Sequence, residues 1–165
     1  MDDAVRTALN TQIKLEFEAS YAYLQAAAYF EHRSLDGFGR WIRLQSQEET
    51  SHAMKLFDFL LDRGASIALT ALDQPHATFT SALDVFQRAL QHEQAVTGQI
   101  DRLYALALDK KDYAAQVLLQ WFISEQVEEE KNASRTVEQL KLVGDNATAL
   151  LLLDGELGGR SAKGA

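Results

Sequence analysis

The stretch IRLQSQEETSHAMKLFDF, residues 42–59, decides the fold class of this chain. One set of its residues recurs at alternating gaps of three and four, which is one face of an α-helix. These residues are Ile42, Gln45, Glu49, His52, Leu56 and Phe59. Glu49 and His52 interrupt the apolar face, and their i,i+3 spacing aims both side chains at the same point. Because an unpaired buried carboxylate is strongly unfavourable unless it takes up a proton, the pair predicts a polar centre inside a helical protein.

Three other segments with the same period carry one inward glutamate each. They are Glu16 within residues 9–30, Glu93 within residues 86–107 and Glu129 within residues 115–140, where Gln126 also faces inward. Without a cation, these inward carboxylates would have to take up protons or be surrounded by buried water. Four glutamates and one histidine on four apolar faces are explained more simply if a cation binds between the helices.

The composition limits the classes of protein that this chain can belong to. A length of 165 residues suits one domain with a sizeable core. The absence of cysteine excludes disulfides and sulfur ligation of a metal. A net charge of −8 disfavours a nucleic-acid partner and favours cations. Residues 1–6 show no signal segment, and the longest apolar run, residues 149–153, is far short of the ~20 residues that span a bilayer. We therefore expect a cytoplasmic protein without a membrane partner.

The same patterns predict an all-α fold in a single domain, residues 1–165. Long helices are expected over residues 3–33, 38–63, from a cap at Thr80 or Ser81 to 108, and from a cap at Asp112 to 144. A short fifth helix is expected from Asp145 or Asn146 to 157, and the tail 158–165 is expected to be disordered. Residues 65–79 lack helical period and contain the only proline, so they predict a long crossover between the second and third helices. The result is a four-helix bundle with one long connection, over residues 3–144, plus the fifth helix.

Counting residues back from the short turns places the inward side chains by depth. Glu16 faces residue 56, about one helical turn from His52, and Glu93 faces residue 127, between Gln126 and Glu129. The candidate ligands of each hairpin are therefore expected to meet at one level. The mixed oxygen and imidazole donors suit iron, manganese or zinc.

Four fragments carry a resemblance to a known family. They are LEFE at 15–18, QEETSH at 47–52, QHEQ at 91–94 and WFISEQVEEEK at 121–131. Together, in this order and at these intervals, they resemble the prokaryotic non-haem ferritins, and the similarity covers roughly residues 3–157. The resemblance implies a ferritin-like bundle and a ferroxidase, which oxidises Fe(II) with O₂ or H₂O₂. It also implies a homo-oligomer, a hollow cage of 24 subunits that stores the Fe(III) mineral.

The resemblance also implies a role for individual residues. Glu16, Glu49 and His52 would hold the first iron. Glu49 would bridge to a second iron held by Glu93 and Glu129, with Gln126 beside it. A third, flanking iron would be held by Glu48, Glu125 and Glu128, sharing Glu129. Tyr23 and Trp121 match aromatic residues near the centre that can supply electrons, so Glu49, His52 and Tyr23 are the expected catalytic residues.

Two departures from related proteins shape the expected subtype. Haem-binding bacterioferritins have a methionine after the glutamate of E-x-x-H, where this chain has Thr50, and a histidine in the fourth-helix motif, which residues 125–129 lack. We therefore expect no haem. The positions of the acidic threefold pore of animal ferritins are occupied by Gln116 and Leu119, so the usual iron access route is not predicted.

Other interpretations of the same residues are kept open. The chain could be a different di-iron oxidase or peroxidase, although it lacks the rubredoxin-like cysteines and the second E-x-x-H of such enzymes. It could also be a metal-binding shell protein without turnover. Glu125 and Glu128 could belong to a solvated helix face, and Tyr23 could donate a hydrogen bond to a ligand carboxylate without any redox role. Surface positions are expected for three histidines, His32, His76 and His92.

Overall fold

Four long helices and one short helix make up the part of the chain that the computed structural model describes, residues 1–160. They are α1 (Asp3–Glu31), α2 (Asp36–Asp62), α3 (Ala82–Asp109), α4 (Tyr113–Val143) and α5 (Ala147–Gly158). The predicted all-α fold is confirmed, and every helix boundary lies within two residues of the expected one. None of these helices, within residues 1–160, combines the length and apolar character needed to cross a bilayer.

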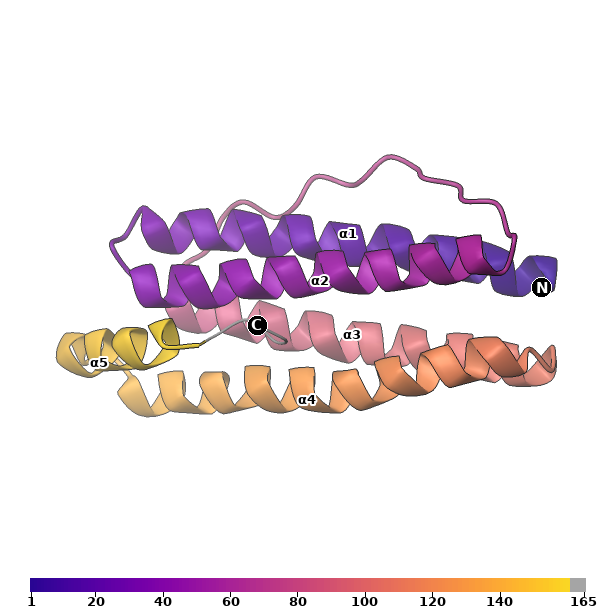
Figure 1. The fold of residues 1–165 in the computed structure, drawn as a ribbon. Coiled ribbons are helices and arrows are strands. Elements are labelled where there is room, and N and C mark those ends of the chain that lie inside the picture. Colours follow the sequence, from indigo (N-terminus) through magenta and orange to yellow (C-terminus); the bar gives the residue numbers. More distant parts are fainter. Residues whose placement is uncertain (161–165) are drawn as a thin grey trace.

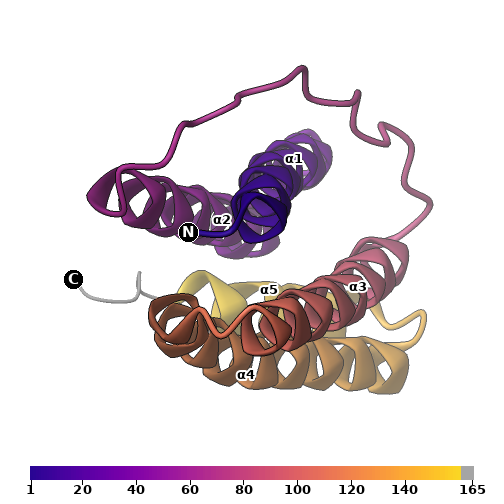
Figure 2. The same cartoon turned by 90° about the vertical axis from the view of Figure 1, so that its right-hand side faces the viewer.

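The helices form two antiparallel hairpins, α1 with α2 and α3 with α4 (Figure 1). The segment between α2 and α3 runs back along the outside of α1, so α2 and α3 point the same way, as the long crossover predicts. Seen along the bundle, the α1–α2 hairpin forms one layer and the α3–α4 hairpin the other (Figure 2). α5 lies at the end of the bundle where α2 begins and α4 ends (Figure 1).

Four of the five helices are capped at the N-terminus by a polar residue. Its side chain accepts a hydrogen bond from a backbone N–H in the first turn. The capping residues are Asp2, Ser81, Asp112 and Asn146. The sequence left two capping residues open. The cap of α3 is Ser81 rather than Thr80, and the cap of α5 is Asn146 rather than Asp145. The cap of α2 differs, because Leu35 offers no side-chain hydrogen bond and the Asp154 carboxylate of α5 accepts from Phe38 N at 2.8 Å instead.

α5 sits unusually close to the first turn of α2. Gly37 was expected between the first two helices, but α2 begins at Asp36 and Gly37 is its second residue. A Cβ atom on Gly37 would lie 1.8 Å from the backbone oxygen of Asp154, and one on Gly158 would lie 3.0 Å from Gly37 Cα. Only glycine fits at this crossing. This close approach holds α5 against α2. Leu153 of α5 is buried in the core.

Part of the predicted tail has a defined place. Gly158 is the last residue of α5, and the Arg160 side chain hydrogen-bonds to α2. The rest of the predicted tail, residues 161–165, lies outside the described residues.

The apolar core is divided into two clusters, one toward each end of the bundle. One contains Phe30, Phe38 and Phe86, and the other contains Ile13, Leu56, Ile100, Leu119 and Phe122. Buried polar residues come from all four long helices but belong to neither cluster. Among them are Gln12, Glu16, Gln45, Glu49, His52, Glu93, Gln126 and Glu129. A set of polar side chains is thus shielded from bulk water inside the bundle.

Candidate metal centre

Each of the four long helices contributes one glutamate to the buried polar set. The exposed fraction of Glu16 is 1%, and that of Glu49, Glu93 and Glu129 is 2% each. His52 is 5% exposed. Charged carboxylates are almost never buried to this extent without a partner, so this set needs protons, donors or a cation to be stable.

Glu16, Glu49 and His52 form one half of the centre. Each offers one ligand atom, and these atoms lie within 4.8 Å of one another. His52 Nδ1 lies 3.2 Å from Glu49 Oε2. Glu16 Oε2 is buried and has no hydrogen-bond partner among the described residues. A buried acceptor without a donor, beside a second carboxylate and an imidazole, is the arrangement that a divalent cation would complete.

Glu93 and Glu129 belong to the other half, where hydrogen bonds join the helices. The Tyr23 hydroxyl donates to Glu93 Oε1, and Gln126 Nε2 donates to Glu93 Oε2 at 3.2 Å. Gln45 Nε2 donates to Glu129 Oε2 at 2.8 Å and to Glu49 Oε1 at 3.3 Å. The amide of Gln45 therefore connects the expected bridging residue, Glu49, with the second half of the centre.

Two glutamines support the carboxylates, and the sequence alone gave neither of them a function. Gln12 Nε2 donates to Glu16 Oε1 at 2.8 Å, and Gln45 contacts Glu49 and Glu129 as described. Each glutamine lies four residues before a candidate ligand glutamate on the same helix face. That spacing was a usable signal, because residues that orient ligand carboxylates are part of most metal sites.

Burial and mutual repulsion make the carboxylates hard to ionise. Burial raises the pKa of Glu16 from 4.5 to about 8, and the charge of Glu49 adds to that rise. Burial also raises the pKa of Glu93 to about 7, although the hydrogen bond from Tyr23 opposes the increase. The pKa of Glu49 is raised well above 4.5 by burial and then by the charge of Glu93. In the absence of a cation, the centre therefore holds protons at neutral pH.

Aromatic rings enclose the histidine. Trp121 and Phe122 lie edge-on to His52, with ring centroids 5.5 and 5.8 Å away. The outer side of Trp121 is covered by Lys55, whose Nζ is 4.3 Å from the ring centroid. Trp121 is 38% exposed, so it contacts both the candidate ligand His52 and the surface.

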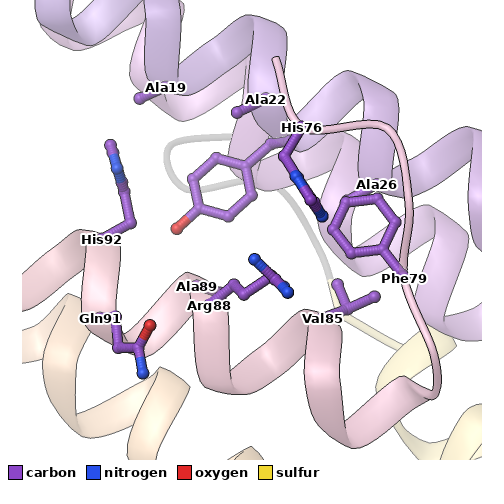
Figure 3. A pocket seen from close by; sticks show the side chains of 11 residues that line it. Ala19, Ala22, Ala26, His76, Phe79, Val85, Arg88, Ala89, Gln91 and His92 are labelled. Atoms are coloured by element: carbon purple, nitrogen blue, oxygen red, sulfur yellow. The ribbon is translucent and has the colours of Figure 1, made fainter.

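A surface pocket of about 320 Å³ lies on the other side of Tyr23, between α1, α3 and the crossover. Figure 3 shows Arg88, Gln91 and His92 from α3 around it, with His76 and Phe79 from the crossover opposite. His92 was expected at the surface; it lines this surface pocket but is half-buried, and its Nε2 is buried without a hydrogen-bond partner among the described residues. Burial lowers the pKa of His92 accordingly.

The three flanking acids lie one residue before the buried Glu49, Gln126 and Glu129. Glu48 and Glu125 are half-buried and Glu128 is exposed. Glu48 Oε2 accepts a hydrogen bond of 2.5 Å from Arg160 Nη2, a partner that the sequence did not indicate. A flanking metal site at these three residues remains a prediction.

Comparison with known proteins agrees with this arrangement. The family model described as Ferritin-like domain matches residues 6–143. The chain belongs to the ferritin family. Bacterial non-heme ferritin of Staphylococcus aureus (strain USA300) is 38% identical over 154 residues, with 93% of each chain covered. An open pore ferritin from the hyperthermophilic archaeon Archaeoglobus fulgidus has 43% identity and a TM-score of 0.96, with 98% of this chain and 99% of the other covered. Membership of the ferritin family was the prediction from the four sequence fragments, and it is confirmed.

Proposed function

We propose that this ferritin-family protein is a ferroxidase and an iron store, of the bacterial non-haem ferritin type. It oxidises Fe(II) at a centre of two irons inside each subunit and retains the Fe(III) product as mineral. The observation that carries the proposal is the group of Glu16, Glu49 and His52, whose ligand atoms lie within 4.8 Å of one another. Within residues 1–160, Glu16 Oε2 has no hydrogen-bond partner.

Each buried side chain has a role in this proposal. Glu16, Glu49 and His52 bind the first iron. Glu49 bridges to the second iron, which Glu93 and Glu129 also bind. Support for the second set comes from the Gln45 amide, which already links Glu49 to Glu129. Gln126 stands beside the second iron and orients Glu93.

The protons and electrons of the reaction can be followed. When two Fe(II) ions enter, the raised pKa values of Glu16 and Glu49 mean that these carboxyls release protons as they become ligands. Two Fe(II) ions supply two electrons, which with two protons reduce O₂ to H₂O₂, or H₂O₂ to two water molecules. Anionic carboxylates stabilise Fe(III) more than Fe(II), which favours oxidation. Two metals about 3.5–4 Å apart can hold a small oxidant between them.

Tyr23 and the flanking acids have separate roles in the proposal. Tyr23 positions Glu93 through its hydroxyl, and in this proposal it also supplies an electron to the centre. Glu48, Glu125 and Glu128 bind a third, weaker iron with Glu129. The more solvated places of Glu125 and Glu128 support weaker binding there.

Storage requires an assembly, and we propose a hollow homo-oligomeric cage of 24 subunits. Leu151 and Leu152 on α5 are 60% and 72% exposed, so α5 keeps an apolar side that another subunit could cover. The Archaeoglobus fulgidus relative is an open pore ferritin, so the packing of subunits around the pores is a property to be measured for this chain. A cytoplasmic location remains an expectation from the sequence.

One experiment tests the proposal as a whole. The protein is given Fe(II) in air, while oxygen uptake is recorded and the native mass and bound iron are measured before and after. A large particle that consumes oxygen and gains many irons per subunit is the expected result. A small oligomer that consumes oxygen without retaining iron would indicate another di-iron oxidase. A large particle without oxygen uptake would indicate a shell without turnover.

A further inference from the structure

Arg160 places a positive charge beside the centre from the far end of the chain. Its Nη2 donates to Glu48 Oε2 at 2.5 Å, and its Nη1 donates to Gln45 Oε1 at 3.0 Å. The guanidinium carbon lies 4.4 Å from the Trp41 ring centroid. The Arg160 side chain is only 16% exposed and that of Glu48 is 11% exposed, so this ion pair is well shielded from water.

The position of Arg160 is set by the docking of α5. The close approach of Gly37 to Asp154, together with the Phe38 N–H···Asp154 hydrogen bond, ties α5 to the first turn of α2. Arg160 follows two residues after α5 ends, and its backbone N–H donates to Leu157 O at 3.1 Å. The guanidinium is therefore carried on a fixed element.

Glu48 is one of the carboxylates that the proposed third iron would need. A metal ion bound to it would stand within a few ångströms of the guanidinium, and two cations at that separation repel strongly in a poorly hydrated place. We propose that Arg160 is a tethered cation that competes with a metal ion for Glu48. This inference rests on the proposed function, because it assigns a regulator to the flanking metal site.

The same contact reaches the di-iron centre through Gln45. Because Arg160 donates to Gln45 Oε1, the NH₂ group of that amide is turned toward Glu49 and Glu129, to which it donates. Displacement of Arg160 removes the donor that fixes this orientation. A metal ion at Glu48 thus weakens the hydrogen bond from Gln45 to Glu49. In this way, occupancy of the flanking site changes the di-iron centre without direct contact between the two sites.

The test measures binding of Zn²⁺, which is not oxidised, by the assembled protein. Wild type is compared with Arg160→Gln, Glu48→Gln and the double variant. The matched control is Arg135→Gln. Arg135 lines a surface pocket together with Trp41 and Arg160, and its side chain is 71% exposed and pairs with Glu156. We expect Arg160→Gln to bind the third Zn²⁺ per subunit about tenfold more tightly. The first Zn²⁺ should bind as in wild type. The second should bind somewhat more weakly, because Gln45 loses the donor that orients its amide. Arg135→Gln should change the affinity for none of the three. When Glu48 is already replaced by Gln, adding Arg160→Gln should not change the affinity for the third Zn²⁺, because the two cations no longer compete for a carboxylate.

A second readout follows Arg160 itself. Trp41 and Trp121 are the only tryptophans, so in Trp121→Phe protein the fluorescence reports on the ring that Arg160 covers. We expect Trp41 emission to change with the third Zn²⁺ and not with the first two. Wild-type affinity for the third Zn²⁺ in Arg160→Gln, or unchanged Trp41 emission while it binds, overturns the inference. If wild type and Arg160→Gln each bind only two Zn²⁺ per subunit, the flanking site and this inference are both overturned, but the two-metal centre is still supported. If they bind fewer than two Zn²⁺ per subunit, the proposed function is overturned.

Discussion

Gln45 on α2 donates a 2.8 Å hydrogen bond to Glu129 on α4, and so joins the two hairpins across the candidate metal centre. The same amide donates to Glu49 at 3.3 Å. Side chains that orient metal ligands typically contribute 10–100-fold to metal affinity or activity. We expect Gln45→Met, which keeps the volume but loses the donor, to weaken binding of the second metal about tenfold. Titration with Co²⁺, followed by its absorption spectrum, measures this. Gln47→Met, an exposed change on the same helix, is the matched control, and equal affinities in the two variants would contradict the role of Gln45.

Glu49→Ala and His52→Ala are expected to slow the rapid oxidation of Fe(II) by about two orders of magnitude or more, because each removes a ligand that sets the geometry of the centre. The metal-free protein should keep its fold. Removing Glu49 also removes repulsion with Glu93, so its melting temperature should stay equal or rise. Stopped-flow oxidation and thermal unfolding measure both effects. Glu138→Ala, at an exposed pair with Lys141, controls for the loss of a surface carboxylate. Wild-type initial rates in either variant at the centre would refute the assignment.

Stability of the metal-free protein should depend on pH in a direction set by the buried carboxyls. Glu16 has a pKa of about 8 in the folded protein against 4.5 for the unfolded chain. Between these values the folded state holds a proton that the unfolded state has released, so the free energy of unfolding falls as pH rises from about 4.5 to about 8. Glu93, with a pKa of about 7, adds to the same decline. Melting temperatures from pH 5 to 9 should fall less steeply in Glu16→Gln, and parallel curves for the two proteins would show that Glu16 ionises normally.

Much of the fold was predictable from the sequence because its signals are local. Apolar residues at helical spacing and polar caps such as Asp112 act within one or two turns, so they fix helix boundaries without knowledge of the partners. The candidate centre was predictable for the same reason, since Glu49 and His52 interrupt an otherwise apolar face. Periodicity assigns a residue to a face but does not say what that face contacts.

The features that the sequence did not predict depend on contacts between distant segments. Arg160 follows two glycines in a stretch without period, and its place is set by the approach of α5 to Gly37. The early start of α2 has the same origin, because its cap comes from Asp154, far along the chain. His92 lies off the inward face of α3, and it is half-buried because the crossover and α1 line the same pocket.

Gly37→Ala should detach α5 from the bundle. The added Cβ would lie 1.8 Å from the Asp154 backbone oxygen, and backbone atoms cannot give way as a flexible side chain can. Gly155→Ala is the matched control, because a Cβ there meets nothing within 4 Å and alanine favours the helix by about 1 kcal/mol. We expect a lower melting temperature and a weaker assembly for Gly37→Ala, and unchanged or higher values for Gly155→Ala. Similar melting temperatures for both variants would mean that α5 is not held at this crossing.

The flanking acids should affect later turnover and leave the first oxidation intact. Glu48 on α2, and Glu125 and Glu128 on α4, each precede a buried residue by one position, a rotation of ~100° about the helix axis. α2 and α4 run antiparallel, so these rotations swing the side chains toward the same side of the bundle. We expect Glu128→Ala to keep the fast oxidation of the first two irons per subunit but to change the rate of later turnovers and the ratio of iron oxidised to oxygen consumed.

Oxygen-electrode and stopped-flow measurements over successive additions of Fe(II) test this expectation, with Glu138→Ala as the control on the same helix. Crystals soaked in Fe(II) or Zn²⁺ provide an independent check, because a third metal should appear beside Glu48 and Glu128 in wild type and be lost in Glu128→Ala. The control variant should retain that metal and the wild-type kinetics. If wild-type crystals hold no metal there and the later turnovers of Glu128→Ala are unchanged, the three acids are a solvated helix face.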